Sequence, residues 1–145
     1  MDSPMPYVAN MKYFPEGETE FLKKILPVVI ETIGQFCRYY SVGVWTQKKI
    51  RPKFTRGAFP DDQKEKREML HAVSEYITDN LESELFTLFM DSEKLSGWGR
   101  RKQGRKFDHH DDTDCWVLFL TEEEFRTLRS AFHLHGSPED IFITN

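Results

Sequence analysis

The chain has few cysteines and no long apolar run, and these two absences limit the classes of protein to which it can belong. Of 145 residues only Cys37 and Cys115 are cysteines, so neither a disulfide framework nor a Cys-x-x-Cys zinc or redox motif is present. Because scarce cysteine is typical of reducing compartments, we expect an intracellular protein, cytoplasmic or, in a eukaryote, nuclear. No stretch approaches about 18 uninterrupted apolar residues, so we expect no membrane span and no membrane partner. We also expect no secretory signal, since no charged segment followed by an apolar run opens the sequence.

The short motifs that mark common enzyme classes are also missing. The sequence has no Gly-x-Ser-x-Gly, no Walker loop, no Gly-x-Gly-x-x-Gly and no His-Glu-x-x-His. Cys37 and Cys115 both lie in apolar patterns, which is typical of small buried side chains rather than of nucleophiles. We therefore assign no catalytic residue and no cofactor, and we favour a binding protein over an enzyme.

The aromatic and aliphatic content is sufficient for one core. Hydrophobic residues make up 39% of the chain and include twelve Phe, while 30% of residues are charged. Hydrophobic periodicity predicts strands over 5–14, 44–56, 115–120 and 141–144, and helices over 18–40, 62–90 and 122–133. This order predicts one α+β domain over residues 1–145, in which a small mixed β-sheet packs against two long helices plus a shorter C-terminal helix.

Local signals place some boundaries more sharply. Thr121 followed by Glu124 has the pattern of a capping box, and Gly136 predicts the end of the helix that begins there. The continuous apolar run over 115–120 predicts a strand in the interior of the sheet. Pro27 lies inside the first predicted helix and should bend or interrupt it.

Charge is distributed unevenly although the net charge is only −4. Two segments without any acidic residue, 48–56 and 100–106, hold ten of the 20 Lys and Arg residues. The rest of the chain therefore carries ten basic residues against 24 acidic ones. The second segment belongs to a basic, glycine-rich loop that we expect at about 96–106. Such segregation shapes the local field more than the net charge does.

The two basic segments predict contact with an anionic partner, above all nucleic acid. Phosphates are bound by several cations along a surface, and unpaired bases stack on flat aromatic side chains, which Trp98 and, beside the first segment, Trp45 would offer. Because aromatic residues accompany the cations and no helix-turn-helix or zinc finger is present, we favour RNA or single strands. The predicted contacts are Lys48, Lys49, Arg51, Lys53, Arg56, Trp98, Arg100, Arg101, Lys102, Arg105 and Lys106.

Two ordinary explanations compete with this prediction. Lysines on an edge strand protect a sheet from pairing with another sheet, which would account for the first segment. The cations of the second segment would pair with the acidic run that follows it. A protein-interaction module, such as an inhibitor or adaptor, is the alternative function, with charge patches and Trp98 contacting a protein partner.

The run from Asp108 to Asp114 raises a third possibility, a divalent metal site. Its carboxylates and imidazoles are common metal ligands, and metal beside cations would suit a nuclease or phosphodiesterase. The candidate ligands are Asp108, His109, His110, Asp112, His133 and His135. The simpler interpretation is a solvated acidic turn, since neighbouring ligands in one run do not define a metal cage.

Overall fold

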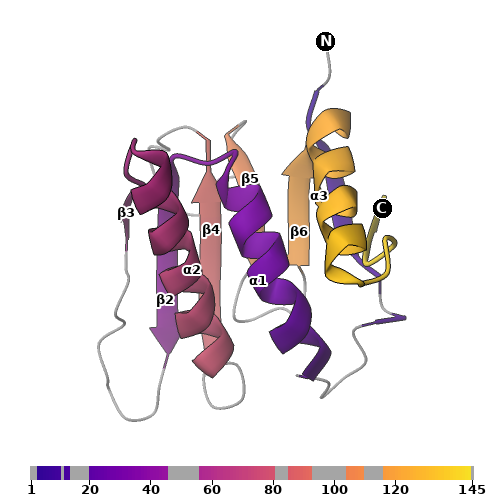
Figure 1. Cartoon of the computed structure of the whole chain (residues 1–145), viewed down its shortest axis with the longest axis horizontal. Coiled ribbons are helices and arrows are strands. Elements are labelled where there is room, and N and C mark those ends of the chain that lie inside the picture. Colours follow the sequence, from indigo (N-terminus) through magenta and orange to yellow (C-terminus); the bar gives the residue numbers. More distant parts are fainter. Residues whose placement is uncertain are drawn as a thin grey trace.

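In the part of the chain that the structure describes, seven strands form a single sheet, and three helices accompany it (Figure 1). The computed structural model describes residues 3–10, 12–13, 20–45, 56–80, 85–92, 104–109 and 116–144. In chain order its elements are β1 (Met5–Ala9), α1 (Glu20–Gly34), β2 (Tyr39–Trp45), β3 (Arg56–Ala58), α2 (Gln63–Asn80), β4 (Leu85–Asp91), β5 (Arg105–His109), β6 (Trp116–Leu120), α3 (Glu122–His135) and β7 (Phe142–Thr144).

The strands lie in the order β3-β2-β4-β5-β6-β1-β7, and every neighbouring pair is antiparallel. The fold is thus α+β, as predicted, although the sheet is antiparallel rather than mixed. Tyr7 of β1 lies opposite both Leu118 of β6 and Thr144 of β7. The first strand therefore sits between the last two, near one edge of the sheet.

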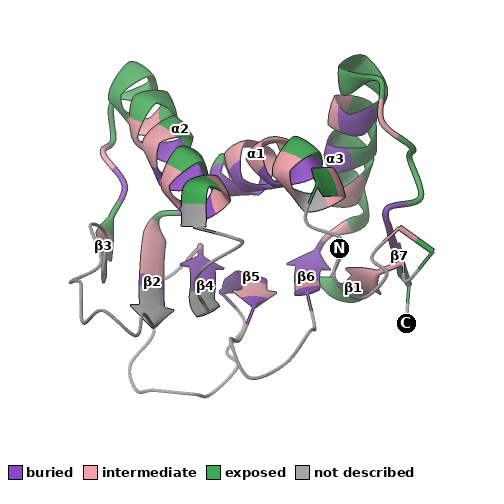
Figure 2. Ribbon diagram, turned by 90° about the horizontal axis from the view of Figure 1, so that it is seen from below, coloured by how far each residue is buried: buried purple, intermediate pink, exposed green. Residues whose placement is uncertain are grey.

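The helices all cover one face of the sheet (Figure 2). Side chains alternate between the faces of a strand, so one set from each strand packs beneath the helices. Burial of these apolar surfaces is the main stabilising term of the fold. The core between the two layers includes Ile30, Ile33, Leu70, Val73, Leu88, Met90, Phe107, Leu118 and Phe132.

The expectation of two long helices and one shorter helix is not confirmed. The predicted helix over 62–90 ends at Asn80, and the segment Leu85–Asp91 is instead strand β4. The helices have 15, 18 and 14 residues, so none is markedly longer. Over a short run, consecutive apolar residues fit a strand as well as a helix, so periodicity alone does not separate the two.

The first predicted helix was likewise too long. It ends at Gly34, and Tyr39–Trp45 forms β2, which suits a run of aromatic and β-branched residues. Pro27 lies within α1 without ending it. The predicted strand over 44–56 overlaps the end of β2 and the start of β3, and residues 46–55 lie outside the described part of the chain.

The C-terminal third agrees closely with the sequence. Thr121 and Glu124 form the complete capping box of α3, and Gly136 ends the helix in the left-handed conformation with φ 81°. β6 lies between β5 and β1, as expected of an interior strand. Cys37 is buried, as predicted, whereas Cys115 falls outside the described residues. Within those residues, no helix combines the length and hydropathy that a membrane crossing needs.

Candidate functional site

The first basic segment reaches the described structure at Arg56. This residue opens β3, is exposed, and lies opposite Ser41 of β2. β3 is an edge strand of only three residues. An exposed cation there suits both a phosphate contact and protection of the edge. Lys48, Lys49, Arg51 and Lys53 lie outside the described residues, and of Trp45 only the backbone position at the end of β2 is described.

Arg105, in the second segment, is held inside the protein. Its side chain is only 9% exposed, its Nε donates to Asp91 Oδ1, and its Nη1 donates to Asp108 Oδ2 at 3.3 Å. The guanidinium lies 4.2 Å from the ring centre of Phe89. Burial raises the pKa of Asp91, and the contact with Arg105 acts in the opposite direction. Asp91 and Asp108 therefore already neutralise the positive charge of Arg105, a residue predicted from the sequence to contact a phosphate.

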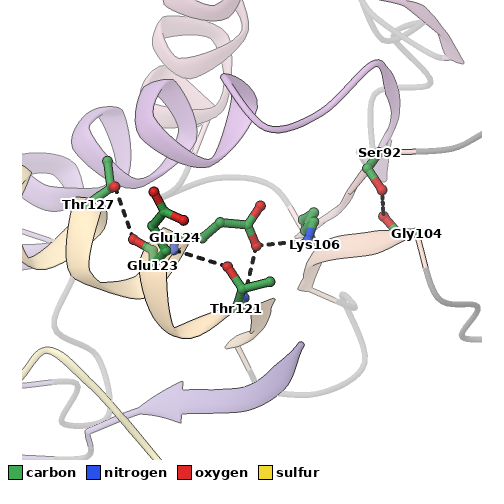
Figure 3. A network of polar contacts seen from close by, with 7 residues as sticks. All are labelled: Ser92, Gly104, Lys106, Thr121, Glu123, Glu124 and Thr127. Atoms are coloured by element: carbon green, nitrogen blue, oxygen red, sulfur yellow. Dashed lines mark hydrogen bonds and ion pairs between the residues drawn. The ribbon is translucent and has the colours of Figure 1, made fainter. Parts of the chain in front are cut away.

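Lys106 is also internal and pairs with a helix. Its Nζ lies 2.8 Å from Glu124 Oε1, and the two side chains are 8% and 17% exposed (Figure 3). The same Oε1 accepts the backbone N–H of Thr121 at 2.9 Å, so one carboxylate serves both the capping box and the ion pair. This contact joins β5 to the first turn of α3.

A β-bulge in β5 explains why the adjacent residues Arg105 and Lys106 contact different partners. Met90 lies opposite Phe107, but Asp91 lies opposite Arg105, so β5 has one residue more than β4 between these pairs. That extra residue is Lys106, and a bulge redirects side chains that regular alternation would place otherwise. Lys106 thus reaches α3 on the covered face of the sheet, while Arg105 remains beside Phe89.

For the described part of the second segment, these contacts agree with the competing explanation, in which its cations pair with acidic residues of the protein. The Arg105–Asp108 pair is the pairing with the following acidic run that the alternative explanation expected. Trp98, Arg100, Arg101 and Lys102 lie outside the described residues, so the phosphate-contact prediction stays untested for them.

The Asp and His residues proposed as metal ligands are placed in separate surroundings. His109 is buried and stacks on Trp116, its partner in the β5–β6 register, with ring centres 3.8 Å apart. His133 and His135 lie in the last turn of α3, where His135 Nδ1 is 2.7 Å from Ser137 Oγ. Among the described residues, no three His, Cys, Asp or Glu side chains are arranged to hold a metal ion. His110 and Asp112 fall outside them.

Sequence reasoning missed an exposed cation, Arg38, at the end of the sheet. Its N–H donates to the carbonyl of Asp91 and its carbonyl accepts the N–H of Phe59, both at 2.8 Å. Its side chain is exposed and makes no ion pair with the residues that the structure describes. The predicted helix over 18–40 concealed this position, because a lone arginine near a helix end carries no signal of its own.

Lys66 of α2 lies beside Arg38. Its Nζ donates to the Cys37 carbonyl at 2.6 Å and lies 5.7 Å from the ring centre of Phe59. Burial lowers the pKa of Lys66, the Cys37 thiol raises it, and the charge of Arg38 lowers it further. Lys66 and Arg38 thus both lie at this end of the sheet.

Two shallow hollows lie elsewhere, along α3 and β7. One, of about 390 Å³, is lined by Phe125, Arg129, Asp140 and β7. The other, of about 400 Å³, is lined by Ser130, His133, Leu134 and Glu139. Leu134 is 87% exposed, the most exposed large apolar side chain among the described residues. Neither hollow contains a residue of the two basic segments.

Comparison of the chain with models of protein families, with curated proteins and with solved structures finds no match.

Proposed function

We propose that this chain is a small intracellular binding protein for nucleic acid, with RNA or another single strand as its ligand. Lys48, Lys49, Arg51, Lys53 and Arg56 would contact phosphates, together with Arg100, Arg101 and Lys102, and Trp98 would stack on bases. Arg105 and Lys106 are omitted from this set because they already form ion pairs with Asp91 and Glu124.

The segregation of charge is the observation that carries this proposal. Ten of 20 basic residues fall in two segments without an acid, in a chain whose other residues are strongly acidic. Arg56, the described exposed member of these segments, lies on an edge strand, where only one side of the strand is paired. Excluding Arg105 and Lys106 leaves the other eight basic residues of the two segments as predicted phosphate contacts.

Salt dependence tests the proposal directly. We would measure fluorescence anisotropy of a labelled single-stranded RNA of about 16 nucleotides, the upper end of site sizes for one small domain. Phosphate contacts make the logarithm of the affinity fall linearly with the logarithm of the salt concentration, by about 0.7 for each contact with a single strand. Duplex RNA and single- and double-stranded DNA would be titrated in parallel to define the preferred form.

A charge-matched pair of variants separates specific contacts from net charge. R100A/R101A/K102A should lower the slope by about 2, since three contacts are removed. K12A/R126A/R129A removes three exposed cations elsewhere and should leave the slope unchanged. An unchanged slope in the first variant, or an equal loss in the second, would contradict the assignment.

Failure of the wild-type chain to bind any nucleic acid at low salt would reject the proposal. A protein partner, the alternative function, would then be the next ligand class to examine.

A further inference from the structure

The last turns of α3 carry a large apolar side chain that the core does not use. Leu128 and Phe132 of this helix are fully buried. Leu134 follows Phe132 by two residues, which is about 200° further around the helix, and is 87% exposed. Single exposed leucines are common on protein surfaces, so the surroundings of Leu134 decide whether it belongs to a binding surface.

A hollow of about 400 Å³ lies directly beside Leu134. Ser130 and His133 of α3 line this hollow together with Leu134 itself and Glu139. Glu139 reaches this side of α3 because the chain turns back after Gly136, which ends the helix in the left-handed conformation. A protruding leucine and a recess walled by the small side chain of Ser130 therefore share one patch of the surface.

Two polar side chains of the hollow have no partner in the described part of the chain. His133 lies on the helix and Glu139 on the turn, and neither side chain forms an ion pair or a hydrogen bond with a described residue. An imidazole can donate a hydrogen bond to a carboxylate in either of its protonation states. A patch that holds donor and acceptor side by side is complementary to its own copy turned about a two-fold axis, because each group then faces its opposite.

Further apolar surface lies next to this hollow. The second hollow, of about 390 Å³, shares Glu139 with the first and is lined in part by Phe125, Ile143 and Thr144. Of the three large apolar side chains that are exposed in the described part of the chain, Leu134 and Ile143 therefore lie along α3 and β7. α3 is the outermost helix on the β7 side of the molecule, so another chain can approach it without meeting α1 or α2 (Figure 2).

We propose that Ser130, His133, Leu134 and Glu139 form a contact patch through which two copies of this chain associate as a two-fold symmetric dimer. Each Leu134 would enter the hollow of the other copy, where it is removed from water, and each His133 would donate to Glu139 of the other copy. A patch of this size predicts a weak and reversible dimer, at the low end of the sizes of specific interfaces. The inference does not depend on the proposed binding of nucleic acid.

Sedimentation velocity of the full-length chain without nucleic acid, from micromolar to millimolar concentration, tests the dimer. The wild type should shift reversibly from one chain mass towards two as its concentration rises. Leu134→Glu should weaken this association by about tenfold to a hundredfold, because the leucine no longer fills the hollow of the other copy. Met5→Glu is the matched control: Met5 is the third exposed large apolar side chain, lies at the start of β1, and should leave the association unchanged.

Two further variants test the hollow and its polar pair. Ser130→Arg places a long side chain in the hollow while Leu134 stays in place, so it should also weaken the dimer. His133→Glu sets a second carboxylate against Glu139 and should weaken the dimer, and adding Glu139→Arg to it should restore association. All these side chains are exposed in the single chain, so circular dichroism and thermal unfolding of each variant should match the wild type.

A wild type that keeps one chain mass at every concentration would overturn the inference and leave the proposed function untouched. Association that neither Leu134→Glu nor Ser130→Arg weakens would also overturn it, because the contact would then lie elsewhere. An equal loss in Met5→Glu would assign the association to unspecific apolar contact. Growth beyond two chain masses would contradict the two-fold symmetry, since only a contact that does not close continues to add copies.

Discussion

Lys106 and Glu124 form a largely buried ion pair that ties strand β5 to the N-terminal turn of α3. Their Nζ and Oε1 atoms are 2.8 Å apart, and Glu124 at the same time accepts the backbone N–H of Thr121. A lysine from a segment rich in Lys and Arg thus contributes to the interior rather than to the surface. Lys106 is the extra residue of a β-bulge, and that local irregularity places it on the covered face of the sheet.

Glu124→Gln should destabilise the protein by about 3 kcal/mol, because it leaves the buried ammonium of Lys106 without its carboxylate. Urea unfolding followed by circular dichroism measures the change. Glu20→Gln is the matched control: Glu20 is 76% exposed and lies 3.9 Å from Lys23, so its loss should cost less than about 1 kcal/mol. Equal effects of the two substitutions would show that the Lys106–Glu124 pair has no special role in stability.

Gly34→Ala should lower the free energy of unfolding by about 1–3 kcal/mol through overpacking. A Cβ at this position would overlap Cδ2 of Leu70 and lie 3.0 Å from its Cδ1, at the contact between α1 and α2. Leu70 is fully buried. Combining Gly34→Ala with Leu70→Ala should therefore cost less than the sum of the two single changes, as measured by the same urea unfolding. Strict additivity would contradict the proposed close contact.

Asp140→Asn should lower the pKa of Tyr13 towards its ordinary value. The Tyr13 hydroxyl donates to Asp140 Oδ1 at 2.7 Å, and this hydrogen bond raises the pKa of the phenol. The folded-state pKa lies above that of the unfolded chain, so the contribution to stability is present below pH 10 and is lost as the pH rises through the folded-state value. Spectrophotometric titration of tyrosinate in wild type and variant checks the shift, and superimposable titration curves would show that the bond is not formed.

Cys37 should resist alkylation until the protein unfolds. The side chain is fully buried, and burial raises the pKa of its thiol, which keeps the reactive thiolate scarce. In a Cys115→Ser variant, iodoacetamide should modify Cys37 quickly in denaturant and slowly in native buffer, as followed by mass spectrometry. Rapid labelling under native conditions would place the thiol at the surface and refute its assignment to the core.

The sequence correctly predicted α3 and β6, because a few neighbouring residues determine where these elements begin and end. The capping box of Thr121 and Glu124 and the glycine at 136 correctly bounded α3, and the apolar run preceding it correctly predicted β6. Strand β4 was missed because its leucines and phenylalanines also continue the helical spacing of α2. Residues 85–91 form a strand because they pair with β2 and β5. Neither pairing could be predicted, since β2 lies far away in sequence and neither β2 nor β5 was predicted as a strand with these bounds.

The candidate site was predictable only as a distribution of charge. Composition identifies cations without acidic neighbours in sequence, but Asp91 and Glu124 reach Arg105 and Lys106 from 14 and 18 residues away. Such pairing is a property of strand register and helix packing, which no local pattern records. Arg38 shows the opposite case, since a cation that looked unremarkable in sequence is exposed where three strands end together.

The position of β1 bears on how the chain folds. β2, β4, β5 and β6 pair as successive or nearly successive segments, so their contacts join parts of the chain that are closer in sequence. β1, in contrast, pairs with β6 and β7. Its residue Tyr7 lies opposite Leu118 and Thr144, both of which are far from it in sequence. Closing so long a loop carries a large entropic cost, and proteins with many such contacts fold slowly. During synthesis, β1 would therefore remain unpaired until β6 has been made, and β7, which pairs with β1, would follow it. Until β1 docks, β6 would present an open edge to a neighbouring chain.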